Sequence, residues 1–163
     1  MTPQDSLFAI AEIAIGLAGF SGLVAAFVQH AGQAWRAEQK ARIVFLIVMS
    51  FGVIVAALTP PALSGVSSSP ALVWGVPMVA FSVFCIVLLV RWIMLARRND
   101  LKLLFPQYSI PIMALTISLQ VATFLSGIGW MLPYSSTLFV FGFLVILVFG
   151  ANMFLALLQS IWE

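Results

Sequence analysis

The chain has 163 residues, of which 63% are hydrophobic and 7% are charged, and its formal net charge is +2. Soluble domains have roughly 45–50% apolar and about 25% charged residues, so this chain has too few charged side chains to cover a surface in water. The composition excludes an ordinary soluble domain and predicts a protein dissolved mainly in lipid. The basic residues form two short clusters that a membrane explains, and we expect no nucleic-acid partner.

Five apolar stretches follow one another along the sequence, and the connectors at residues 64–70 and 133–136 are rich in turn-forming residues. A membrane span needs about 20 mainly apolar residues. The stretches are continuously apolar rather than alternating, which favours helices over barrel strands. We therefore predict an all-α bundle of five transmembrane helices in a single transmembrane domain over residues 1–163, with helices at about residues 7–28, 43–63, 72–95, 110–132 and 137–162. Prolines at 60, 61 and 77 predict a break or kink in the second and third helices.

The basic residues predict the orientation of these helices. All seven lie beside the first or the third connector: Arg36, Lys40, Arg42, Arg91, Arg97, Arg98 and Lys102. Because short positively charged loops stay in the cytoplasm, we expect the N-terminus outside and the C-terminus inside. The same side chains are expected to contact lipid headgroups. The first stretch has no basic region before it, unlike a signal peptide, so we expect it to be retained as a span.

Glu12 is the one acidic residue that we expect inside a transmembrane span, and it is therefore the main functional candidate. A carboxylate in a bilayer is costly, so such a residue usually faces protein or a wet cavity. Proton and cation relays use carboxyl groups held in this way. An alternative is that Glu12 lies close enough to the outer surface to be wetted, or is a neutral acid hydrogen-bonded between helices.

Small residues surround Glu12 on one face of the predicted first helix. At 100° per residue, the face contains Gly16, Ala18, Gly19, Gly22 and Ala26. Small side chains let two helix backbones approach closely. The pattern predicts that this face packs against another helix and that Glu12 points into protein.

Several polar residues of other predicted spans are candidate partners for Glu12 in ion or proton binding: Thr59, Gln120, Thr123, Ser126 and Asn152. Two interpretations remain open. In the first, a polar path leads from Glu12 through Thr123 and Gln120 toward Asn152. In the second, these groups only form hydrogen bonds that hold the helices together.

The stretch AEIAIGLAGFSGLVAAF, from Ala11 to Phe27, resembles the first helix of small uncharacterised bacterial multi-pass inner-membrane proteins. This resemblance implies a location in the bacterial inner, or plasma, membrane and implies no activity. We expect no enzyme, cofactor or metal site, because the sequence has no phosphate loop, metal-ligand spacing or nucleophile elbow.

Two hypotheses for function follow from these residues. The chain is a small oligomeric channel or a proton- or cation-coupled transporter that uses Glu12, or it is a non-catalytic accessory or assembly subunit of a larger membrane complex. In both cases the expected partners are the lipid bilayer and either further copies of the chain or another membrane protein.

Overall fold

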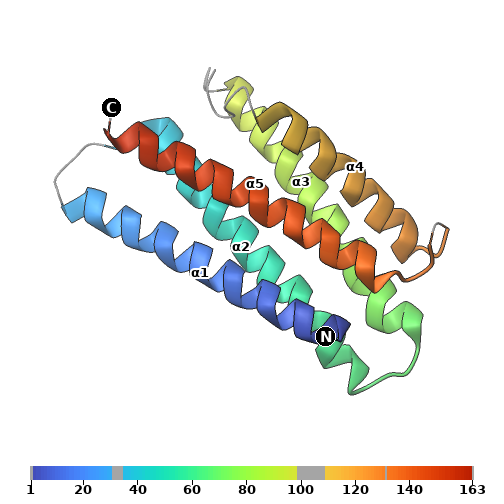
Figure 1. The fold of residues 1–163 in the computed structure, drawn as a ribbon. Helices are drawn as coiled ribbons and strands as arrows, with labels where there is room; N and C mark the ends of the chain where they lie inside the picture. The colour runs from blue at the N-terminus through green and yellow to red at the C-terminus, as the bar shows by residue number, and fades with distance from the viewer. Residues whose placement is uncertain (1, 31–34, 99–108, 131, 163) are drawn as a thin grey trace.

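The structure is a computed structural model, and it describes residues 2–30, 35–98, 109–130 and 132–162. Within these ranges the chain forms helices and no strand, as the sequence predicts. The elements are α1 (Pro3–His30), α2 (Ala37–Ser64), the π-helical turn η1 (Ala71–Gly75), α3 (Val76–Arg98), α4 (Ser109–Gly127) and α5 (Ser136–Trp162). The helices run up and down alongside one another (Figure 1).

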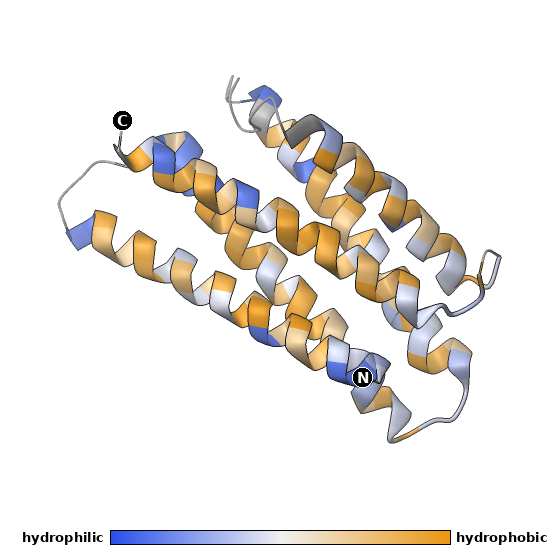
Figure 2. Ribbon diagram, viewed as in Figure 1, coloured by the Kyte–Doolittle hydropathy of each residue, from blue (hydrophilic) through white to orange (hydrophobic). Residues whose placement is uncertain are grey.

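The surface of the bundle suits lipid. Four helical segments are long and apolar enough to cross a membrane: Pro3–His30, Ala37–Ser64, Ala71–Leu95 and Ser136–Ile161. Helix α4 contains a shorter apolar segment, from Pro111 to Gly127. Large apolar side chains point outward, including Phe20, which is 63% exposed, and Val55, which is 65% exposed. Figure 2 shows apolar residues along the length of the helices and polar ones mainly near their ends. These features support a membrane helix bundle.

Helices α2 and α5 lie in the middle of the bundle. Helix α1 packs on α2 and also contacts α5, whereas α3 and α4 lie on the other side (Figure 1). Fully buried side chains from four helices form the core between them: Leu7, Leu46, Val53, Met78, Phe139 and Phe143. Only 28% of the most apolar stretch of α1 is buried inside the bundle, whereas 50% of the corresponding stretch of α2 is buried. Helix α1 therefore presents a broad uncovered face.

The first two helices begin earlier than predicted because polar residues cap them. At the start of α1, Thr2 N donates to Asp5 Oδ2 at 2.7 Å and Asp5 N donates to Thr2 Oγ1 at 3.2 Å, with Pro3 between them as the first helical residue. At the start of α2, Arg36 N donates to Gln39 Oε1 at 3.1 Å. Both helices therefore extend beyond their apolar parts.

The prolines act differently in the two helices. Helix α2 continues through Pro60 and Pro61 to Ser64, so the predicted break is absent there. Pro77 follows the wide turn of η1, in which Val76 N donates to Ala71 O. A proline ring crowds the carbonyl group four residues earlier, and a π turn directly before Pro77 relieves this crowding.

The fourth helix ends at Gly127 rather than at residue 132, which corrects the sequence prediction. Among the described residues of the turn that follows, φ is positive at Gly129 (80°), Leu132 (42°) and Tyr134 (57°). Ser126 holds this turn closed, because its hydroxyl donates to Leu132 O at 2.6 Å and accepts from Ser135 N at 3.1 Å. Ser126 therefore stabilises the connection to α5 and does not lie beside Glu12.

Candidate functional site

Glu12 is exposed on the outer side of α1. The buried side chains of this helix are Leu7, Ile10, Ala11, Ala14, Ser21 and Val28. At 100° per residue, the centre of this buried set lies opposite Glu12. Within a single chain Glu12 therefore does not point into protein, contrary to the sequence prediction.

The glycines near Glu12 are equally uncovered. A Cβ atom added to Gly16, Gly19 or Gly22 would meet nothing within 4 Å. Ala26 is also exposed, whereas Ala18 is half-buried at the margin. We call Glu12, Gly16, Gly19, Gly22 and Ala26 the α1 outer face. No helix of the described chain covers it.

Other glycines make the close helix contacts inside the bundle. A Cβ atom on Gly75 would lie 2.8 Å from Gly127 O, and one on Gly127 would lie 2.9 Å from Met78 Cβ. Real Cβ atoms essentially never approach so closely. The backbones of η1 and α4 therefore cross at a point where both positions require glycine.

The polar candidates do not form a path with Glu12. Thr123 and Gln120 are buried on α4, which lies across the bundle from α1 with α2 and α5 between them (Figure 1). Thr123 donates to Leu119 O at 2.8 Å, and Thr59 donates to Val55 O at 2.6 Å, each within its own helix. Asn152 is half-buried on α5. The described chain therefore does not bring Glu12 and Thr123 together.

Gln120 is the exception among these polar groups. Its side chain is 4% exposed, and both its Nε2 and its Oε1 are buried without a hydrogen-bond partner in the described chain. A Cβ atom on Gly142 of α5 would lie 3.5 Å from Nε2, so the amide is held against the backbone of α5. An unpaired amide is costly in an apolar interior, which marks Gln120 as a candidate binding group.

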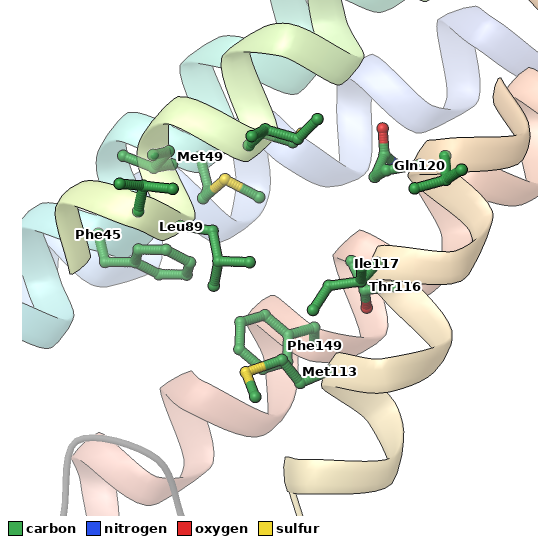
Figure 3. Close-up of a pocket in the computed structure, with 13 residues that line it drawn as sticks. Phe45, Met49, Leu89, Met113, Thr116, Ile117, Gln120 and Phe149 are labelled. Carbon is green, nitrogen blue, oxygen red and sulfur yellow. The ribbon is translucent and has the colours of Figure 1, made fainter. Parts of the chain in front are cut away.

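Gln120 lines a cavity of about 230 Å³ between α2, α3, α4 and α5. Figure 3 shows Gln120 and Ile117 on α4, Leu89 on α3, and Phe45 and Phe149 on the central helices. The remaining lining is apolar apart from Thr116, whose hydroxyl donates to Ile112 O: Met49, Cys85, Ile86, Leu88, Val90, Met113 and Val121. Sequence analysis singled out Gln120 but not the cavity, because the walls come from four separate helices.

Basic and polar residues of α2 bind the end of α5. Arg42 is 6% exposed, and its guanidinium donates to Ala156 O at 3.0 Å. Gln39 Nε2 donates to Ser160 O at 2.9 Å, and the guanidinium of Arg36 donates to the same carbonyl. Ser160 O has no donor within α5, so Gln39 and Arg36 satisfy it, and the cationic groups interact favourably with the dipole of the helix C-terminus. We therefore assign Arg42 to helix packing in place of the predicted headgroup contact.

The other basic residues keep surface positions. Lys40, Arg91, Arg97 and Arg98 are exposed, and Arg36 is exposed although it binds Ser160. Their setting is compatible with the predicted headgroup contacts. Lys102 lies outside the described residues.

No protein-family model, curated protein or solved structure matches this sequence. The resemblance of the first helix to bacterial inner-membrane proteins therefore stays a prediction. The candidate sites rest on geometry alone: the α1 outer face on one side of the bundle and the Gln120 cavity on the other.

Proposed function

We propose that this chain is an integral membrane protein that works as an assembly subunit, and that its α1 outer face docks on the same face of a second copy. The observation that carries this proposal is the combination of an exposed carboxyl group with three glycines that have nothing above them. Bare glycines in a membrane helix allow close packing of another helix. The accessory role fits this arrangement better than a path through one chain.

The depth of Glu12 supports a protein partner. Helix α1 has 28 residues and is therefore about 42 Å long, which places Glu12 about 7 Å from its midpoint. The hydrocarbon core of a bilayer extends roughly 15 Å to each side of its centre. Glu12 then lies within the hydrocarbon, where an uncovered acidic side chain costs a few kcal/mol. A neighbouring protein surface removes that cost.

A second copy is a chemically suitable occupant for this face. Two-fold association places the same residues opposite one another, so glycine meets glycine and one Glu12 approaches the other. A neutral carboxyl group is both a hydrogen-bond donor and an acceptor, so two that face one another can pair directly. Each Glu12 then gains a hydrogen-bond partner without a cation in the interface.

We also propose that the N-terminus lies outside and the C-terminus in the cytoplasm of a bacterial inner membrane. The helices alternate in direction, and this brings the described basic residues to the end of the bundle where α1, α3 and α5 finish: Arg36, Lys40, Arg42, Arg91, Arg97 and Arg98. The positive-inside rule assigns that end to the cytoplasm.

Disulfide cross-linking tests the assembly through α1. In a Cys85→Ala background, Gly19→Cys is expected to give a covalent dimer upon oxidation in membranes. The matched control is Val148→Cys, because Val148 is 57% exposed near the middle of α5. This variant is expected to stay monomeric.

A second experiment measures association directly. Gly19→Leu is expected to abolish association in a two-colour energy-transfer assay while the monomer stays folded, because no described atom outside its own helix backbone lies within 4 Å of a Cβ at this position. A chain that is monomeric in membranes and forms no cross-link from a cysteine placed at position 16, 19 or 22 would overturn the proposal. A cross-link to another protein would replace the second copy with that partner.

Ion or proton transport is the second candidate, and the position of Glu12 on the assembly face favours it. In the dimer the two carboxyl groups meet at the interface, where a relay between the two chains is available although the described residues of one chain form none. Glu12→Gln is then expected to abolish proton or cation flux in proteoliposomes and to leave the dimer intact. Unchanged flux in this variant would reject the transport role without affecting the assembly role.

A further inference from the structure

We propose that the Gln120 cavity is a binding site for a single alkyl chain that ends in a neutral hydroxyl or carboxyl group. The polar end of this ligand pairs with Gln120, and its chain lies along the apolar walls. The site is on the opposite side of the bundle from the α1 outer face, so the inference does not depend on the proposed assembly.

The dimensions of the cavity select a slender ligand. Its volume is about 230 Å³, which is below the roughly 300–1,000 Å³ of pockets for drug-sized molecules. Along α4 it extends from Met113 to Val121, a length of about 12 Å. A space of this volume and length accommodates one alkyl chain.

The mouth of the cavity opens toward lipid. Four of its lining residues are exposed apolar side chains from the two helices that flank it: Ile86, Val90, Ile117 and Val121. The hydrocarbon region of a bilayer holds no water to hydrogen-bond with exposed polar groups. A ligand dissolved in the membrane therefore enters the cavity from the bilayer, between α3 and α4. Water from the hydrocarbon region does not take its place beside Gln120.

The amide of Gln120 determines the chemistry of the polar end. It offers a donor at Nε2 and an acceptor at Oε1, and both are unpaired. A hydroxyl group or a neutral carboxyl group provides an acceptor and a donor together, so it satisfies both atoms once the buried amide turns toward it. A plain alkane satisfies neither, and an ionised carboxylate brings an unpaired charge into an apolar space.

Aromatic rings line the far end of the cavity, and a buried tryptophan lies directly behind one of them. Helices α3 and α5 run antiparallel to α4, which places Phe149 beside Met113 and away from Gln120 (Figure 3). Phe45 lines the same end, and its ring centroid lies 4.8 Å from that of the buried Trp92. A heavy atom at the tip of the bound chain therefore quenches Trp92.

The test uses a decanol with bromine on its terminal carbon and a protein in which Trp92 is the only tryptophan, the others being replaced by phenylalanine. Quenching of Trp92 in detergent micelles is expected to saturate with the alcohol. Gln120→Leu is expected to weaken the apparent affinity by about tenfold, because it removes both hydrogen bonds. Ser118→Ala, which changes an exposed hydroxyl bonded to Ala114 O on the same helix, is expected to bind like the parent protein.

Two further ligands identify the group that Gln120 recognises. Bromodecane is expected to bind the parent protein about tenfold more weakly than the alcohol, and this comparison needs no variant. The brominated decanoic acid is expected to bind when its carboxyl group is neutral and to lose affinity as it ionises. Quenching that rises without saturation, or an alcohol that binds no better than bromodecane, would overturn the proposal. Equal affinity in a folded Gln120→Leu protein would do the same.

Discussion

Gly127→Ala is expected to lower the free energy of unfolding by about 1–3 kcal/mol, as overpacking does at a tight contact. The new methyl group would lie 2.9 Å from both Met78 Cβ and Val79 Cγ2 and 3.1 Å from Gly75 O. Two of these atoms are fixed by the backbone, so η1 and α4 must separate. Unfolding of the purified protein, followed by circular dichroism in mixed micelles, measures the loss.

Gly16→Ala is the matched control for this prediction. It makes the same chemical change in a helix, but nothing lies within 4 Å of its Cβ. Alanine is also the better helix former by about 1 kcal/mol, so the free energy of unfolding should stay the same or rise in micelles dilute enough to keep the protein monomeric, where the α1 outer face has no partner. Equal losses in the two variants would show that the crossing of η1 and α4 is not the tight contact described above.

Arg42→Ala is expected to cost about 1.5–3 kcal/mol of stability, the range for a hydrogen bond to a charged group. The guanidinium of Arg42 is buried and binds Ala156 O in the second-last turn of α5, where it ties a carbonyl group of that helix to α2. Its loss should loosen the last turns of α5 before the whole bundle unfolds. Hydrogen exchange of the amides around Ala156 and Ser160 measures this local effect.

Lys40→Ala provides the comparison on the same helix. Lys40 is exposed, and surface substitutions of this kind usually change stability by no more than about 0.5 kcal/mol. Arg42→Lys should restore only part of the stability, because an ammonium group lacks the planar fork of a guanidinium. Stability that rises in Arg42→Ala would contradict the role of Arg42 as a tie between α2 and α5.

The helices could be predicted from composition because continuous apolar length is visible in one sequence. The end of α4 could not, since residues around Trp130 and Leu132 are as apolar as the helix before them. What ends the helix is the positive φ of Gly129 and Leu132 together with the hydrogen bonds of Ser126. These depend on how the turn meets α5, which local apolarity does not show.

The glycines show a second limit of sequence reasoning. Helical periodicity correctly places Gly16, Gly19 and Gly22 on one face, but it does not show whether a helix of the same chain covers that face. The tight crossing instead occurs at Gly75 and Gly127, which are distant in sequence and share no pattern. Gln120 could be selected as a polar residue in a span, whereas its unpaired amide and its cavity depend on residues from three other helices.

The two proposed sites lie on different sides of the bundle and make different demands on it. Docking at the α1 outer face leaves the mouth between α3 and α4 open to lipid. Gly19→Leu is therefore expected to abolish association without changing quenching of Trp92 by the brominated alcohol. Gln120→Leu is expected to weaken that quenching without changing association. The two variants thus separate the assembly role from the ligand role.

Cysteine accessibility in intact cells tests most directly that these helices span a membrane with their basic end in the cytoplasm. In a Cys85→Ala background, Ser68→Cys reports on the connector between α2 and η1, and Lys40→Cys reports on the opposite, basic end; both positions are exposed. A membrane-impermeant maleimide added outside is expected to label position 68 at once and position 40 only after the cells are permeabilised. Labelling of position 40 in intact cells, with position 68 protected, would contradict the orientation, and immediate labelling of both would contradict the membrane span itself.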